Sequence, residues 1–142
     1  MKIVVITGCL GFIGSHITRT CLEKGYKVYG VDSITYAANT QLIREFKKNS
    51  NFHFHEQDIC DLKTLPDCDY VINTAAETHV GNSIIDSSDF IKTNIVGTQN
   101  LLQLIKDKPS NVCEKPILLH FSTDEVYGDI TSGSHTENDY LN

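Results

Sequence analysis

The stretch that decides the fold is TGCLGFIG at residues 7–14, which directly follows the apolar run IVVI at residues 3–6. Gly8, Gly11 and Gly14 allow a tight turn and a close approach of backbone to phosphate, and a helix that begins there attracts negative charge. Their spacing is G-x-x-G-x-x-G, not the commoner G-x-G-x-x-G. The stretch therefore predicts a strand, a glycine loop and a helix. It leaves open whether the loop holds a pyrophosphate or is a tight turn without a ligand.

Short β-rich runs and helical patterns alternate outward from this loop. The runs occupy residues 3–6, 27–31, 52–54, 70–73 and 117–121. A first helical pattern repeats at Ile13, Ile17 and Cys21 and ends before Gly25, where a helix-terminating glycine belongs. A second covers residues 40–48.

The third helical pattern has the clearest apolar stripe. Asp86 or Ser87 is able to cap its start. The stripe consists of Ile91, Ile95, Leu102 and Ile105.

The predicted strands are nearly continuous in apolar character, as expected for a parallel sheet that is covered on both faces. Strand–helix–strand repetition with right-handed crossovers predicts an α/β fold, a doubly wound parallel sheet of the Rossmann type with about five strands. We expect residues 1–128 to form this domain and residues 129–142 to form an irregular tail.

Composition excludes several classes of protein. The 142 residues carry a net charge of −6, and Lys47-Lys48 is the only adjacent basic pair, so we expect no nucleic-acid partner. No apolar run approaches the ~18 residues that a membrane span needs, so we expect no membrane partner. Pro 3 and Gly 9 are too few for a low-complexity chain.

Cysteine and histidine usage predicts no metal site and a reducing environment. Five cysteines without a C-x-x-C pair favour free thiols and therefore a cytoplasmic protein. The start MKIVVITGC is similar to a short lipoprotein signal, but its apolar run ends after four residues. His53 and His55 share one strand face without a third ligand at suitable spacing.

Asp32 strengthens the interpretation of the glycine loop as a dinucleotide site. It closes the second strand, eighteen residues beyond Gly14, where a carboxylate can accept hydrogen bonds from an adenosine ribose. A carboxylate there repels a 2′-phosphate, which favours NAD over NADP. The alternative is an aspartate that only caps the strand end.

Six blocks together resemble a known family along most of the chain. In order and spacing they are similar to the extended short-chain dehydrogenases/reductases (the NAD-dependent epimerase/dehydratase family), and most similar to its nucleotide-sugar 4,6-dehydratases. The blocks are TGCLGFIGS (7–15), DSITYA (32–37), DICD (58–61), AAETHV (75–80), TNIVGT (93–98) and STDEVYG (122–128).

The resemblance implies a reaction that converts NDP-glucose to NDP-4-keto-6-deoxyglucose. Hydride passes from C4 of the sugar to NAD and returns at C6, while a base removes the C5 proton and an acid protonates the departing C6 hydroxyl. By resemblance Asp124 is the acid, Glu125 is the base and Thr123 bonds the C4 oxygen. Two carboxyl groups can divide these roles when their environments separate their pKa values. The alternatives are a solvated loop cap or, within the family, a 4-epimerase or decarboxylase.

The resemblance also assigns cofactor contacts. It places Phe12 and Ile13 at the pyrophosphate, Ser33, Ile34 and Thr35 at the ribose, and Asp58 and Ile59 at the adenine. The rest of the cofactor would be flanked by Thr74, Ala75, Ala76, Glu77 and Thr93, with Thr78 facing the sugar.

The chain departs from the family pattern at two sites. Cys9-Leu10 replaces the usual Gly-Ala and is expected to add bulk at the tightest point of the loop, and Gly81 replaces an acidic residue.

The family's Tyr-x-x-x-Lys pair is missing. None of the six tyrosines has a lysine four residues later. A lysine one turn on would lower the pKa of the tyrosine that takes the C4 hydroxyl proton. We therefore expect the N-terminal part of an enzyme without its substrate domain, able to bind NAD and inactive alone. The alternative is a stand-alone NAD-binding module. Family members are often dimers, so a homodimer is one expectation for the complete enzyme.

Overall fold

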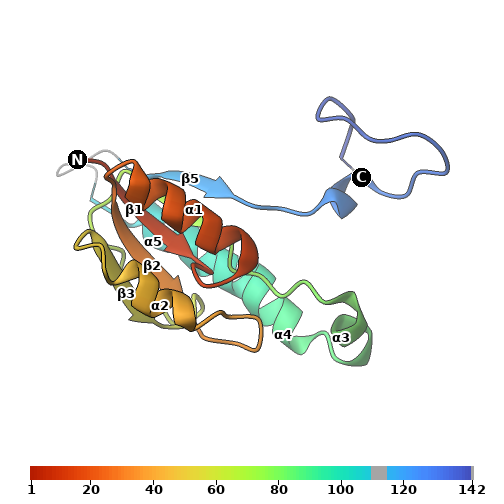
Figure 1. The fold of residues 1–142 in the computed structure, drawn as a ribbon. Helices are drawn as coiled ribbons and strands as arrows, with labels where there is room; N and C mark the ends of the chain where they lie inside the picture. Colours follow the sequence, from red (N-terminus) through yellow and green to blue (C-terminus); the bar gives the residue numbers. More distant parts are fainter. Residues whose placement is uncertain (110–114, 142) are drawn as a thin grey trace.

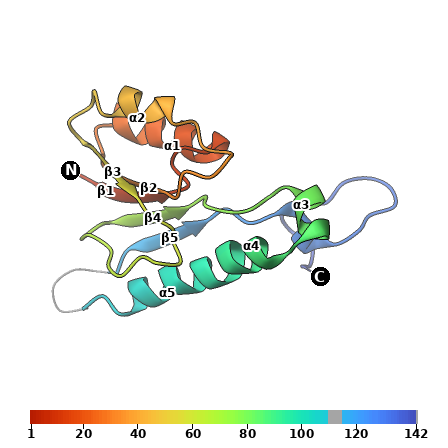
Figure 2. The same cartoon turned by 90° about the horizontal axis from the view of Figure 1, so that it is seen from below.

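A parallel sheet of five strands forms the centre of the computed structural model, which describes residues 1–109 and 115–141. The strand order is β3-β2-β1-β4-β5, with all four pairings parallel (Figure 1; β4 is labelled in Figure 2). The glycine loop follows the central strand, and the segment after β5 starts from one edge of the sheet. The strands are β1 (Ile3–Thr7), β2 (Lys27–Asp32), β3 (Phe52–Glu56), β4 (Tyr70–Asn73) and β5 (Ile117–His120).

Helices cover both faces of the sheet (Figure 2). On one face lie α1 (Phe12–Glu23) and α2 (Gln41–Phe46). The other face is covered by a continuous helix made of α4 (Ser88–Phe90), the π-helical η1 (Ile91–Gly97) and α5 (Thr98–Lys106). The predicted doubly wound α/β fold is confirmed.

Successive side chains of β1 point to opposite faces of the sheet and contribute to two hydrophobic cores, one under each helix layer. Val4 and Ile6 pack toward α1 and α2 with Leu22 and Phe46, whereas Val5 packs on the other side with Leu101. All of these side chains are buried, so the central strand is apolar on both faces as predicted. The helix-ending role of Gly25 is also confirmed, since its φ is +74°.

The apolar stripe predicted for the long helix is not the face that packs against the sheet. Ile91, Ile95 and Leu102 are 52%, 63% and 50% exposed, while the neighbouring Leu101 is fully buried and Ile105 packs against the core. The helix packs on its Gly97 face because the absence of a side chain there lets the helix approach Ile59 closely. A Cβ at Gly97 would lie 2.5 Å from Ile59 Cδ1. Apolar residues occupy more than one face of this helix, so periodicity alone cannot tell which one packs.

The start of this helix is tied by Asp86, one of the two predicted caps. Its Oδ1 accepts the Ser88 N–H at 2.9 Å, and the Ser87 side chain makes no capping bond.

The remaining described elements are short. They are the helix α3 (Val80–Ile85) and the 3₁₀ turn η2 (Asp124–Tyr127). Residues 128–141 contain no helix or strand. Within the described ranges, no helix has both the length and the apolar character to cross a membrane.

Candidate functional site

The glycine loop is held in place by backbone hydrogen bonds and by close packing. Gly8, at φ +68°, donates its N–H to Val31 O at 2.8 Å, and Gly11 donates to Gly8 O at 3.0 Å. A Cβ at Gly14 would lie 2.0 Å from Gly8 O, and a Cβ at Gly8 would lie 2.8 Å from the backbone of Thr74. Glycine is therefore required where the loop, the start of α1 and the end of β4 meet.

Cys9 and Leu10 do not crowd the loop, which corrects the expectation that their bulk falls at its tightest point. Both side chains are buried at 0–1% exposure and belong to the core under α1. The Cys9 Sγ fills space that Gly30 leaves free, because a Cβ at Gly30 would lie 2.7 Å from it. Burial raises the pKa of the Cys9 thiol well above its ordinary value.

Asp32 ties the end of β2 to the glycine loop. Its Oδ2 accepts the Leu10 N–H at 2.9 Å, and its Oδ1 accepts the Ile34 N–H at 2.9 Å. The residue is only 9% exposed, yet it lines the pocket above the loop. Each carboxylate oxygen retains a second acceptor site for a ligand hydroxyl.

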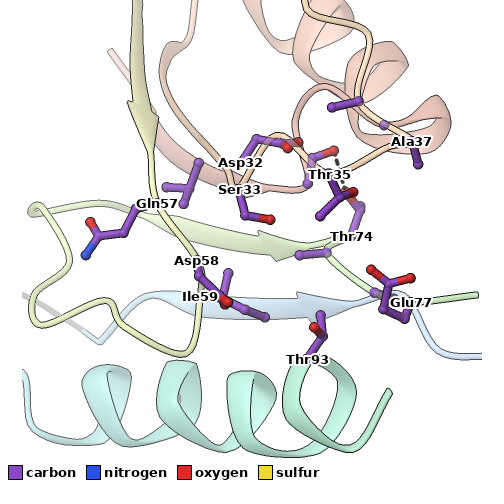
Figure 3. A pocket seen from close by; sticks show the side chains of 16 residues that line it. Asp32, Ser33, Thr35, Ala37, Gln57, Asp58, Ile59, Thr74, Glu77 and Thr93 are labelled. Atoms are coloured by element: carbon purple, nitrogen blue, oxygen red, sulfur yellow. Dashed lines mark hydrogen bonds between the residues drawn. The ribbon is translucent and has the colours of Figure 1, made fainter. Parts of the chain in front are cut away.

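The pocket above the loop collects most of the predicted cofactor residues. Figure 3 shows their side chains arriving from the ends of several strands, with Thr93 reaching up from the long helix. The predicted residues that line it are Gly8, Gly11, Asp32, Ser33, Thr35, Asp58, Ile59, Thr74, Ala75, Ala76, Glu77 and Thr93.

Four predicted cofactor residues lie outside this pocket. Phe12 is 84% exposed on α1, and Ile13 lines a neighbouring cavity. Gly14 is buried beneath the loop, and Ile34 packs against the core under α1.

A polar network supports the floor of the site at the ends of β1 and β4. Thr74 Oγ1 donates to Thr7 O at 2.6 Å. Asn73, which is 1% exposed, accepts the Thr7 hydroxyl and lies with its Nδ2 3.0 Å from His120 Nδ1. The bonds join three adjacent strands beneath the site.

The neighbouring cavity holds most of the predicted substrate residues. Thr78, Thr123 and Glu125 line it together with Ile13 and His120, and it shares Thr74–Glu77 with the first pocket. Asp124 is not among its lining residues. The Glu125 N–H donates to Thr123 Oγ1 at 3.3 Å, and the Thr123 hydroxyl donates to Asp124 Oδ1 at 3.4 Å. The three side chains are exposed.

Sequence reasoning missed two residues that hold Glu77, which lines both cavities. The Tyr36 hydroxyl donates to Glu77 Oε2 at 3.0 Å, which links the loops after β2 and β4. Asn94 clamps the Glu77 backbone by accepting its N–H and donating to its carbonyl, both at 2.9 Å. Asn94 belongs to the TNIVGT block and Tyr36 to the DSITYA block, so each lay in a stretch with a signal. Neither block indicates that Tyr36 has a partner 41 residues away.

The histidines and cysteines considered as metal ligands pack against aromatic rings or remain free thiols. His53 and His55 stack on Tyr29, with ring centroids 5.1 and 6.1 Å away. Cys9, Cys21, Cys60 and Cys68 carry free thiols, and Cys113 lies outside the described residues. No group of three potential metal ligands occurs in the part of the chain that the structure describes.

Comparison with known proteins identifies a family. The family model described as GDP-mannose 4,6 dehydratase matches residues 5–142. A dTDP-glucose 4,6-dehydratase of Haemophilus influenzae is 39% identical over 142 residues, which cover 92% of this chain and 42% of that protein. One of Neisseria meningitidis is 40% identical, with coverage of 92% and 40%.

A solved structure agrees with these relatives. The dTDP-glucose 4,6-dehydratase DesIV of Streptomyces venezuelae, crystallised with NAD and TYD bound, superposes with a TM-score of 0.85 at 39% identity. The match covers 99% of this chain and 45% of DesIV. The chain thus spans less than half the length of the relatives it matches.

Proposed function

The chain belongs to the GDP-mannose 4,6 dehydratase family, and we propose that it is the NAD-binding part of a nucleotide-sugar 4,6-dehydratase. In this proposal the parent enzyme converts NDP-glucose to NDP-4-keto-6-deoxyglucose and is a lyase. Residues 1–128 form the cofactor domain, and residues 129–142 lead to the catalytic helix of the parent.

One observation carries the proposal for NAD. A single pocket joins the glycine loop, the Asp32 carboxylate and the segment Thr74–Glu77 across the carboxyl ends of adjacent parallel strands. Open α/β sheets bind ligands at this edge. Loop N–H groups at the start of α1 would face the pyrophosphate, and Asp32 would accept the ribose hydroxyls while repelling a 2′-phosphate.

The other contacts follow along the pocket. Ser33, Ile34 and Thr35 would lie beside the ribose, and Asp58 and Ile59 would meet the adenine. Thr74, Ala75, Ala76, Glu77 and Thr93 would flank the remainder of the cofactor, while Phe12, Ile13 and Gly14 shape the pyrophosphate loop.

The second cavity supports the assignment of the substrate end. When bound, NAD would supply the oxidant for C4 of the sugar and the hydride that reduces C6. In our proposal Thr123 bonds the C4 oxygen, Glu125 removes the C5 proton and Asp124 protonates the departing hydroxyl, with Thr78 facing the sugar. The 142 residues hold no Tyr-x-x-x-Lys pair to take the C4 hydroxyl proton. We therefore expect this chain alone to bind NAD without turnover.

The cofactor proposal is tested by calorimetric titration of the 142-residue chain with NAD. Asp32→Ala should weaken NAD binding by at least about tenfold, because the ribose then loses a charged acceptor. Asp32→Asn keeps the shape of the side chain and should fall in between, and thermal melting checks that both variants fold. Asp129→Ala, an exposed position beyond η2, serves as the control. Unchanged NAD affinity in folded Asp32→Ala would refute the assignment.

We also propose that the protein is cytoplasmic and that the complete enzyme is a homodimer. The four free thiols in the described residues support a reducing compartment. The exposed apolar residues Ile91, Ile95 and Leu102 on the long helix support a helix-mediated dimer, because spacings of four and seven residues are typical of helix seams. Sedimentation of the complete enzyme with and without Ile95→Glu tests this, and a monomeric wild type would contradict it.

A further inference from the structure

Lys92 holds a carboxylate that faces the cofactor pocket. Its Nζ lies 2.8 Å from Asp58 Oδ2, while Asp58 Oδ1 accepts the Cys60 N–H at 2.9 Å. Asp58 lines the pocket, and its side chain is 26% exposed. Both oxygens therefore have a fixed partner, and each retains a further acceptor site for a ligand.

The π-helical segment η1 places this lysine beside two other residues that meet the site. Lys92 reaches Asp58 after β3, Thr93 lines the pocket, and Asn94 clamps Glu77 after β4. The Cys60 thiol adds a bond to Lys92 O at 3.2 Å, which ties the Asp58–Cys60 turn to the helix. Three consecutive residues thus connect one helical turn to two loops of the pocket. Such π-helical turns are frequent at functional sites.

The ion pair has a consequence for binding. A flat base that covers Asp58 removes water from its carboxylate, and an unpaired charge that loses water is costly. Lys92 is 55% exposed and approaches from the helix, so it can compensate this charge while the base lies on the pocket side. Burial alone would raise the pKa of Asp58, but the hydrogen bonds from Lys92 and Cys60 outweigh it and lower the pKa. The carboxylate therefore stays ionised and accepts hydrogen bonds only.

We propose that Lys92 is a positioning residue that presents the Asp58 carboxylate to the 6-amino group of the cofactor's base. This inference rests on the proposed NAD function and deepens it. It makes base selectivity a property of the Asp58–Lys92 pair. A base with a 6-oxo group presents an acceptor oxygen in place of the 6-amino donor. Its remaining donor on that edge, N1–H, lies at a different position, so a carboxylate aligned with the 6-position favours the 6-amino base.

The test compares two dinucleotides on the 142-residue chain, NAD and nicotinamide hypoxanthine dinucleotide. Lys92→Met keeps the aliphatic stem and removes the charge. We expect it to raise the Kd for NAD about fivefold, the value of one exposed charge pair, and to leave the Kd for the hypoxanthine analogue within about twofold. Lys92→Arg should restore NAD affinity, because guanidinium also pairs with a carboxylate.

A matched control is available at the opposite end of the sheet. Lys2 pairs with Asp69 at 2.8 Å and is 53% exposed, close to the values for Lys92. Lys2→Met should leave both affinities unchanged. In the Asp58→Asn background, Lys92→Met should cause no further loss of NAD affinity, since the partner is already neutral.

The possible failures are distinct. An equal loss for both dinucleotides would mean that Lys92 acts through general electrostatics, and it would overturn the proposal, as would an unchanged NAD affinity. If the wild-type chain binds neither dinucleotide, the proposed NAD function itself fails, and this inference fails with it.

Discussion

The pocket proposed for the cofactor (the cofactor end) and the neighbouring cavity proposed for the substrate (the substrate end) differ in how firmly the chain holds their polar side chains. At the cofactor end, Thr7, Asp32 and Asn73 are at most 9% exposed, and each is bonded to a residue from another element. At the substrate end, Thr123 and its two acidic neighbours are exposed, and among the described residues the Thr123 side chain bonds only to those neighbours. The difference shows that buried hydrogen bonds fix the polar side chains of the proposed cofactor site, whereas the residues proposed for the elimination step are held only by local bonds.

Strand order explains the difference. The glycine loop follows β1, which lies at the centre of the sheet between β2 and β4. The STDEVYG block follows β5 at the edge, where Ile117 and Leu119 are 66% and 53% exposed. In the described residues, no strand pairs with the outer side of β5. A central strand end is enclosed by neighbours on both sides, whereas an edge strand end has a neighbour on one side only.

The largest expected effect comes from a substitution that disrupts the glycine loop at the cofactor end. Gly14→Ala would place a Cβ 2.0 Å from Gly8 O, so the loop and α1 must separate. We expect a loss of about 3 kcal/mol in the free energy of unfolding and no measurable NAD binding. Urea denaturation and calorimetry measure both. Gly81→Ala is the matched control, because nothing lies within 4 Å of its added Cβ. Equal behaviour of the two variants would contradict this account of the loop.

A smaller effect is expected from removing the Asn73 side chain, which connects the two ends by hydrogen bonds. Asn73 is the buried side chain that contacts both Thr7 on β1 and His120 on β5. Asn73→Ala leaves the Thr7 hydroxyl buried without this partner, and we expect it to destabilise the chain by about 2 kcal/mol. Relative to the wild type, hydrogen exchange in this variant should accelerate more at the amides of β5 than at those of β2. A change below about 0.5 kcal/mol in chemical denaturation would show that the network contributes little.

The acid dependence of stability sharpens the comparison further. The pKa of Asp58 lies below its ordinary value in the folded chain, so its contribution to stability is present above the unfolded pKa. It is lost as the pH falls below about 4 toward the folded pKa. Asp58→Asn should remove this part of the pH dependence, at a cost of about 0.5 kcal/mol at neutral pH. Denaturation curves between pH 3 and 7 measure it, and identical slopes for variant and wild type would contradict it.

The smallest effect is expected at the substrate end. Glu125→Gln should change neither the unfolding free energy nor NAD affinity by more than about 0.3 kcal/mol, because the side chain is exposed. In the complete enzyme, the same variant should bind NAD normally and block exchange of the C5 proton with solvent. Unchanged C5 exchange in the complete enzyme would refute the assignment of Glu125 as the base.

Local patterns predicted much of the fold and part of the site. The loop at residues 7–14, the helix ending before Gly25 and the five strands each depend on neighbouring residues, and the structure confirms them. The local pattern could not predict which face of the long helix packs on the sheet. That choice depends on the close contact between Gly97 and the Ile59 side chain. Lys92 and Tyr36 were missed because their partners lie 34 and 41 residues away.

The sequence by itself determined the alternation of strands and helices, the glycine loop and the order of the acidic residues along the chain. These features follow from backbone sterics and short-range periodicity, which act within about ten residues. Only the tertiary structure decided which helix face packs, where the Cys9 side chain goes and which groups hold Asp32 and Asp58. Those outcomes depend on space and on hydrogen-bond partners contributed by distant segments, and no local pattern specifies them.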